Sequence, residues 1–156
     1  MNDNQLRCWL SQARFHVSDP VDTDINRPLA NSTTPLMYAA QTGDLDVVRS
    51  LLKRGANPAL LNADGNGALW FACYANNAAC IAELIKAGAP LDTQNVNGAT
   101  ALIYCASSGK PSLVRLLLDA GADTELQTQD DFTALELAAD LGCLRLLKDA
   151  RRTELA

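Results

Sequence analysis

The residues of this chain that could do chemistry are few and lie far apart. Among 156 residues there is one histidine, His16, and of the five cysteines Cys8 lies nearest to it in the sequence. An imidazole beside a thiol can activate the sulfur as a nucleophile. The sequence provides no residue that would orient His16 for this task. We therefore expect no enzyme and no catalytic residue; the alternative is a small enzyme or ligand-binding protein that uses Cys8 and His16.

The sequence does not indicate a metal or cofactor site either. The cysteines are widely spread and form no C-x-x-C pair, which argues against a zinc site. Adjacent carboxylates such as Asp130 and Asp131 lack the spacing of a calcium-binding loop. The glycine-rich string ADGNGA lacks the lysine and the flanking strand of a phosphate-binding loop. We expect no cofactor and no metal.

The elements that must position these residues repeat every 33 residues. This interval separates Leu36, Leu69, Leu102 and Leu135. Each leucine lies in a similar phrase, such as TTPLMYAAQTG in the first repeat and FTALELAADLG in the last. A repeat of this length predicts an array of small units in which each unit covers the apolar face of the next.

The most regular unit, residues 95–127, predicts two helices. Thr100 is placed to cap a first helix over residues 101–108. Pro111 suits the first turn of a second helix, which ends near Gly121. The segments between units are polar and turn-prone, so we expect hairpin-like loops there.

The turn after each first helix predicts a left-handed backbone. Glycine adopts this conformation freely and asparagine next best. The four positions carry Gly43, Asn76, Gly109 and Gly142. Two other positions, Cys73 and Cys105, replace alanine of the other units, so we expect these cysteines to be small buried residues in a reducing compartment.

In these features the chain resembles the ankyrin-repeat family. The family pattern, D-x-x-G-x-T-P-L-H-x-A-A-x-x-G-H-x-x-V-V-x-x-L-L-x-x-G-A-D, is matched best by TTPLMYAAQTGDLDVVRSLLKRGAN, from Thr33 to Asn57. The resemblance implies an all-α fold, an ankyrin-repeat solenoid of helix-turn-helix units joined by hairpin-like loops. The family's histidine is replaced here by Met37, Trp70, Ile103 and Glu136. We expect Trp70 to pack, and we expect three aromatic residues that recur at one position to be core: Tyr38, Phe71 and Tyr104.

We expect one ankyrin-repeat domain over residues 1–156, with three full repeats between two partial ones. The full repeats cover residues 29–61, 62–94 and 95–127. An N-terminal half-repeat cap and a long loop occupy residues 1–28, and the cap would cover the first pair of helices with Leu6, Trp9, Leu10 and Ala13. A truncated fourth repeat and C-terminal cap occupy residues 128–156, where CLRLLKDARR replaces a full second helix.

Composition limits the partners. The net charge of -5 and the pI of 4.7 argue against nucleic acid and anionic lipid, which need positive potential. The start has no basic leader before an apolar run and no stretch long enough to cross a bilayer. We expect a cytoplasmic monomer whose partner is another protein with a basic or neutral contact surface.

The resemblance also implies where that partner binds, because ankyrin repeats use hairpin tips and exposed positions of the first helices, along a concave surface. Carried over to this sequence, the partner-binding positions are Asn31, Thr33, Gln41, Thr42, Asp64, Asn66, Tyr74, Val96, Asn97, Ser107, Ser108, Gln129, Asp130, Phe132 and Asp140. Tyr74 and Phe132 are the two large groups among them. Each could anchor a partner or fold back on its own repeat, and the sequence leaves both outcomes open. The implied function is a non-catalytic protein–protein interaction module, an adaptor or a regulatory subunit.

Overall fold

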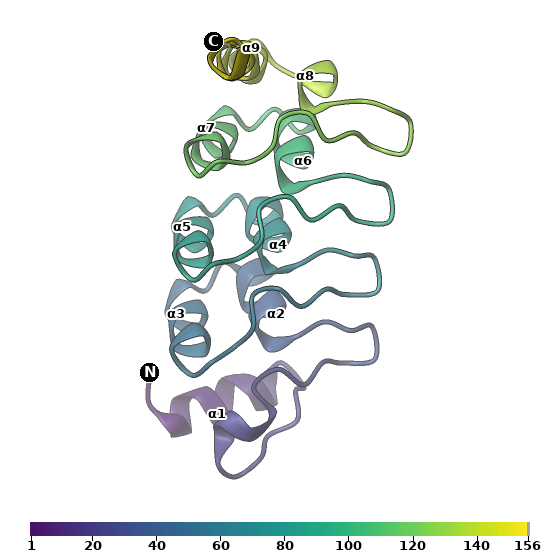
Figure 1. Ribbon diagram of the computed structural model, residues 1–156. Helices are drawn as coiled ribbons and strands as arrows, with labels where there is room; N and C mark the ends of the chain where they lie inside the picture. Colours follow the sequence, from purple (N-terminus) through teal and green to yellow (C-terminus); the bar gives the residue numbers. More distant parts are fainter. Residues whose placement is uncertain (156) are drawn as a thin grey trace. The chain divides into compact units, whose positions relative to one another are not determined.

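The computed structural model describes residues 1–155, and side chains as far as Thr153. The described residues form helices and loops and contain no strand. They group into two compact units, unit 1 (Met1–Ala89) and unit 2 (from Pro90 onward). The expected all-α arrangement of helix pairs joined by loops is confirmed in each unit (Figure 1).

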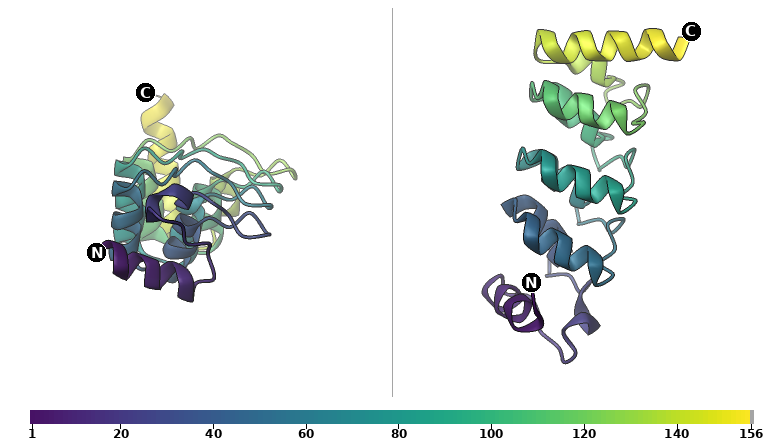
Figure 2. Two further views of the ribbon diagram at one scale, coloured as in Figure 1. Left: turned by 90° about the horizontal axis from the view of Figure 1, so that it is seen from below. Right: turned by 90° about the vertical axis from the view of Figure 1, so that its left-hand side faces the viewer.

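Unit 1 contains two helix pairs preceded by a single helix. Its elements are α1 (Asp3–Gln12), the 3-10 helix η1 (Val21–Asp24), α2 (Pro35–Thr42), α3 (Leu45–Lys53), α4 (Ala68–Tyr74) and α5 (Ala78–Lys86). The first helices α2 and α4 pack together, and the second helices α3 and α5 lie side by side (Figure 2). The hairpin loops project to one side of these helices (Figure 1).

Unit 2 repeats this plan with two further helix pairs. Its elements are α6 (Ala101–Ser107), α7 (Pro111–Asp119), α8 (Ala134–Leu137) and α9 (Leu141–Leu155). The first helices α6 and α8 contact each other, as do the second helices α7 and α9. Thr100 caps α6 as expected, because its hydroxyl oxygen accepts the backbone N–H of Ile103 at 3.1 Å.

Three of the four predicted left-handed turns are confirmed. The φ angles of Gly43, Asn76 and Gly109 are 72°, 55° and 67°. Gly142 is different, because it lies inside α9 and has no positive φ. The prediction for Gly142 was therefore wrong.

The fourth repeat is shortened in its first helix, which corrects the expectation that its second helix is incomplete. α8 has only four residues, whereas α9 has 15. The chain leaves α8 early because the backbone N–H of Ala139 donates to the carbonyl of Ala106 at 2.9 Å. Asp140 then starts α9, since its carboxylate accepts the backbone N–H of Cys143 at 2.7 Å. Gly142 falls in the first turn of the new helix, close to Pro111 of α7.

The repeated leucines line the core in three repeats and only partly in the fourth. Leu36, Leu69 and Leu102 are buried, whereas Leu135 in the short α8 is half-buried. Cys73 and Cys105 are fully buried, as expected from their alanine-like positions. The core of each unit thus consists of side chains from adjacent helix pairs.

Only some of the side chains predicted to bury the N-terminal cap are buried, and the cap is also anchored by buried residues that were not predicted. Leu6 and Leu10 are buried, whereas Trp9 and Ala13 are half-buried. Phe15 completes the cap as a buried residue whose ring lies 5.9 Å from that of Tyr38 in α2. Val21 and Ile25 of the long loop are buried as well.

The three recurring aromatic residues differ in burial. Phe71 is buried, whereas Tyr38 and Tyr104 are half-buried. The Tyr104 hydroxyl lies 3.4 Å from the Lys110 ammonium, so this side chain keeps a polar contact. The expectation that all three are core residues holds fully only for Phe71.

Candidate protein-interaction surfaces

The hairpin of repeat 2 is built around the side chain of Asn62. Its amide oxygen accepts the backbone N–H groups of Asp64 and Asn66, each at 3.0 Å. The backbone N–H of Ala63 donates to the carbonyl of Asn31 at 3.3 Å, which joins the tips of two consecutive hairpins. These bonds hold Asp64 and Asn31 outward as exposed residues of unit 1.

Two predicted contact residues of unit 1 are not available to a partner. Thr33 is 8% exposed and Asn66 is 9% exposed. Both lie on the returning arm of a hairpin, where their carbonyl oxygens accept the backbone N–H groups of Leu29 and Asn62 at 2.9 Å. Their role is to close the hairpins, and we leave them out of the contact surface.

The first helices of unit 1 present an aromatic pair. Tyr74 is 54% exposed, and its ring stacks on that of Trp70 at 5.7 Å with an interplanar angle of 16°. Trp70 is half-buried and meets Phe71 edge to face at 5.2 Å. Trp70 therefore packs, as expected, and its ring stacks against that of Tyr74. Gln41 and Thr42 of α2 are also exposed.

The hairpins of unit 2 are joined at their tips in the same way. The Asn95 side chain accepts the backbone N–H groups of Asn97 and Ala99 at 2.9 and 3.0 Å. The backbone N–H of Gln129 donates to the carbonyl of Asn97 at 2.9 Å, and its side-chain amide donates to the carbonyl of Val96. Val96, Asn97 and Gln129 are thus held together, and all three are exposed.

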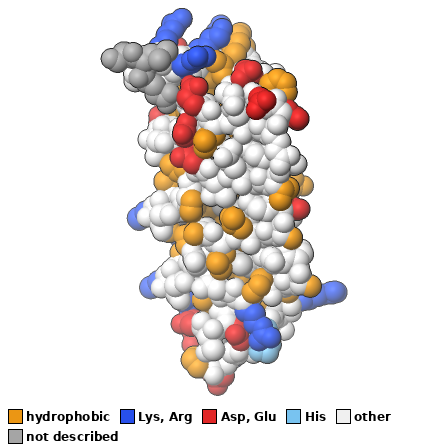
Figure 3. All heavy atoms as spheres, turned by 45° about the vertical axis from the view of Figure 1, so that its right-hand side comes forward, with side chains coloured by type: hydrophobic (Ala, Val, Ile, Leu, Met, Phe, Trp, Pro, Cys, Tyr) orange, Lys and Arg blue, Asp and Glu red, His pale blue; other side chains and the backbone are white. Residues whose placement is uncertain are grey.

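Unit 2 exposes two large apolar side chains at these tips. Val96 is 54% exposed and Phe132 is 44% exposed, so Phe132 does not fold away into its own hairpin. Four further predicted contact residues of this unit are also exposed: Ser107, Ser108, Asp130 and Asp140. On the face in Figure 3, hydrophobic atoms lie in separate small areas within a mostly uncharged surface.

Charge is distributed unevenly along the chain. Residues 90–140 carry eight Asp and Glu side chains but only two Lys and Arg side chains. Asp140 is stabilised as a carboxylate, because the hydrogen bond from the Cys143 backbone lowers the pKa of Asp140. In unit 1, by contrast, arginines neutralise carboxylates; Arg54 lies 2.7 Å from Asp3 and 2.9 Å from Asp22. These hydrogen-bonded carboxylates, first Asp22 and then Asp3, raise the pKa of Arg54.

The structure does not assemble the candidate catalytic pair. The sulfur of Cys8 lies 3.5 Å from the Gln12 side-chain amide, and Nε2 of His16 lies 3.5 Å from a carboxylate oxygen of Asp24. No hydrogen bond joins Cys8 to His16 in the part of the chain that is described. The other cysteines are buried, and burial raises the pKa of the Cys143 thiol to about 12, with a smaller effect from Asp140. A thiol of this kind is a poor nucleophile at neutral pH.

Residues 1–155 contain neither a metal site nor a helix that could cross a membrane. No group of three or more His, Cys, Asp or Glu side chains in this range could hold a metal ion. No helix in this range combines the length and the apolar character needed to cross a membrane.

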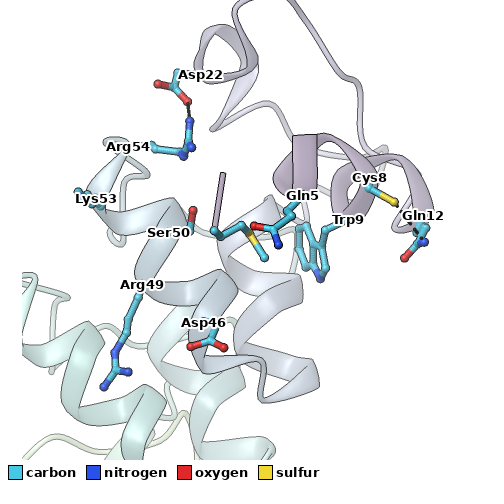
Figure 4. Close-up of a pocket in the computed structure, with 11 residues that line it drawn as sticks. Gln5, Cys8, Trp9, Gln12, Asp22, Asp46, Arg49, Ser50, Lys53 and Arg54 are labelled. Atoms are coloured by element: carbon cyan, nitrogen blue, oxygen red, sulfur yellow. Dashed lines mark hydrogen bonds and ion pairs between the residues drawn. The ribbon is translucent and has the colours of Figure 1, made fainter. Parts of the chain in front are cut away.

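Sequence reasoning missed a groove on the side of unit 1 formed by α1 and α3. Its volume is about 950 Å³, and Trp9 of α1 and Ser50 of α3 stand on its opposite walls (Figure 4). Individual residues gave no signal for it, because none of them departs from what a capping helix and a second helix require. The groove arises only from how the two helices are placed.

Comparison with known families agrees with this architecture. The family model described as ankyrin repeats (3 copies) matches residues 6–95 and 69–152. The chain belongs to the ankyrin-repeat family. Members of this family generally mediate protein–protein interactions and are typically non-catalytic. A comparison with curated proteins finds no match.

Proposed function

We propose that this chain is a non-catalytic adaptor or regulatory subunit that binds a partner protein through first-helix and hairpin-tip side chains. The contact residues are contributed by each unit separately. Those of unit 1 are Asn31, Gln41, Thr42, Asp64 and Tyr74. Those of unit 2 are Val96, Asn97, Ser107, Ser108, Gln129, Asp130, Phe132 and Asp140.

The observation that carries this proposal is the exposure of large apolar side chains at these positions. Tyr74 on α4, and Val96 and Phe132 on the hairpin tips, each leave 44% or more of their surface in water. Exposed aromatic groups surrounded by small polar residues are the usual anchors of protein interfaces. The stacking of Tyr74 on Trp70 fixes its ring before a partner arrives, which reduces the entropy lost on binding.

The acidic excess of residues 90–140 supports a partner with a basic or neutral contact surface. Complementary charge raises the association rate and excludes acidic partners. No disulfide joins the cysteines of residues 1–155, and four of the five are buried, which supports a reducing compartment such as the cytoplasm.

The test compares capture of proteins from a native extract by the tagged wild-type chain and by two variants, Tyr74→Ala and Phe132→Ala. Lys86→Ala on α5 and Arg115→Ala on α7 serve as controls, because both residues are exposed on second helices. We expect one partner to be retained by the controls and reduced at least tenfold by an aromatic variant, since anchor truncation costs about 2 kcal/mol.

Circular dichroism must first establish that all four variants keep the wild-type helix content. Unchanged capture by both aromatic variants would exclude the proposed surface. If the control variants lose capture equally, the partner contacts the second helices instead.

A further inference from the structure

The groove between α1 and α3 differs from the surface proposed above, because it lies on the second-helix side of unit 1. It is lined by Met1, Gln5, Cys8, Trp9 and Gln12 from the N-terminal segment, by Asp22 of η1, and by Asp46, Arg49, Ser50, Lys53 and Arg54 from α3 and its end. Each wall has its own chemistry.

The groove exists because α1 is a single helix without a partner helix of its own. α1 packs mainly on η1, whereas α3 is covered by α5 on its other side. Arg54 stabilises this arrangement through ion pairs with Asp3 at the start of α1 and with Asp22 in η1. The cap therefore covers α3 only in part, and the surface between the two helices stays open.

The α1 wall is uncharged and partly apolar. Gln5, Cys8, Trp9 and Gln12 occupy positions i, i+3, i+4 and i+7 and so share one face of α1. Figure 4 shows the Trp9 ring pointing from α1 toward α3. Trp9 is half-buried, with its ring edge against Tyr38 at 5.7 Å, so the indole is rigid and still accessible.

The α3 wall carries three cations, Arg49, Lys53 and Arg54, and one carboxylate of its own, Asp46, which lies in the first turn where the helix dipole favours it. Arg54 is neutralised by Asp22 at 2.9 Å and by Asp3 at 2.7 Å. Lys53 is exposed, and no ion pair reaches it from any described residue. Arg49 lies one turn before Lys53 and is 54% exposed, although it pairs with Glu83 at 3.0 Å.

We propose that this groove is a second docking site, which takes an acidic amphipathic segment of a partner protein. Apolar side chains of that segment pack on Trp9, and its carboxylates pair with Lys53 and Arg49. Two helices that flank an open groove suit a third helix, since this is how helix-in-groove recognition works. An open groove of about 950 Å³ suits a polypeptide better than an enclosed small molecule.

The chain contains a matched pair of lysines for testing this site. Lys53 ends α3 and Lys86 ends α5, so they occupy the same position in consecutive repeats, and both are exposed. Only Lys53 lines the groove. The chain also contains a reporter, because Cys8 lines the groove and is the exposed cysteine, whereas the other four are buried.

The probe is a synthetic helical peptide of about four turns with leucines on one face and glutamates on the other; a second peptide has lysines in place of the glutamates. Titration calorimetry measures affinity for the full chain, and the rate of Cys8 labelling by an aromatic disulfide reports the location. We expect the acidic peptide to bind and to slow Cys8 labelling in a saturable manner, and we expect the basic peptide to do neither.

Lys53→Glu should weaken the acidic peptide at least about fivefold, because a favourable charge pair becomes a repulsive one. Lys86→Glu should bind it like the wild type. Tyr74→Ala should also leave binding unchanged, which separates this site from the first-helix surface. The proposal is overturned if Lys53→Glu and Lys86→Glu weaken binding equally, or if the acidic peptide binds but leaves Cys8 unprotected. It is also overturned if Cys8 protection depends only on the concentration of the chain, because a second copy of the chain would then occupy the groove.

Discussion

The side-chain amide of Asn77 donates a hydrogen bond to the carbonyl oxygen of Gly43 at 3.1 Å. Gly43 ends α2 with a φ of 72°, and Asn77 precedes α5 in the next repeat. The same side chain accepts the backbone N–H of Cys80 at 3.0 Å. One asparagine therefore closes the turn of one repeat and caps the second helix of the next.

Substitution of Asn77 should separate these two roles. Asn77→Asp keeps the oxygen that caps α5 but loses the donor to Gly43, whereas Asn77→Ala loses both. We expect Asn77→Ala to lower the free energy of unfolding by about 2 kcal/mol and Asn77→Asp by about 1 kcal/mol. Urea denaturation measures both losses. Equal losses would mean that the cap on α5 contributes nothing, and an unchanged stability of Asn77→Asp would mean that the bond to Gly43 contributes nothing.

Two glycines with similar backbones should respond differently to alanine. Gly88 has a φ of 86° and open space around its missing Cβ, whereas Gly98 has a φ of 76° and a Cβ there would lie 2.9 Å from the Gln129 backbone nitrogen. Gly88→Ala should cost about 1 kcal/mol for the left-handed backbone alone. Gly98→Ala should cost clearly more, because the tips of two hairpins must separate. Thermal unfolding of both variants checks the difference, and equal losses would argue against tight joining of the tips.

The repeated leucines should not be equivalent. Leu69→Ala and Leu102→Ala remove buried side chains and should each cost about 2 to 5 kcal/mol. Leu135→Ala should cost less, since Leu135 is half-buried in the four-residue α8. Ser107→Ala at an exposed position is the control and should change stability by less than about 0.5 kcal/mol. A loss at Leu135 as large as at Leu102 would show that the fourth repeat packs like the others.

Asp140 should make the stability of unit 2 sensitive to acid. Its hydrogen bond from the Cys143 backbone lowers the pKa of Asp140 in the folded chain. A lowered pKa stabilises the fold above the unfolded value of about 3.9, and this contribution disappears as the pH falls through the folded value. Asp140→Ala should lower stability at pH 7 and flatten its decline below about pH 4. Asp130→Ala, which removes no helix cap, should leave the slope of stability against pH unchanged.

Cys143 should make stability fall in alkali. Burial raises the pKa of its thiol to about 12, whereas an unfolded cysteine titrates near pH 8.5. A raised pKa stabilises the fold fully below the unfolded value, and this contribution is lost as the pH rises toward the folded one. Denaturation between about pH 8 and pH 10 should show a steeper decline for the wild type than for Cys143→Ala. In native protein at pH 8, thiol labelling with mass spectrometry should find Cys8 modified and Cys143 intact.

The helix starts could be read from the sequence because they depend on near neighbours. Thr100 and Pro111 begin the elements predicted for them, since a cap and a fixed φ act within one turn. Gly142 misled the same reasoning. The predicted turn does not form, because the backbone N–H of Ala139 donates to the carbonyl of Ala106 in the preceding repeat. No local sequence pattern predicts this contact.

The repeat positions of the candidate contact residues could be predicted from the sequence, but the exposure of each side chain at those positions could not. Tyr74 and Phe132 are exposed at the positions that the family resemblance indicates. Thr33 and Asn66 occupy the same repeat position as Phe132 and accept the same hairpin-closing backbone bond, yet both are buried. The same family position thus carries the exposed Phe132 and the buried Asn66.

The sequence by itself determined the 33-residue period, the helix pairs and three of the four predicted left-handed turns, because these follow from interactions among residues close together in the chain. Only the tertiary structure decided that α9 starts early and that α1 leaves a groove beside α3. The physical reason is that helix propensity and turn preference are local, whereas burial and grooves depend on packing between segments one repeat or more apart.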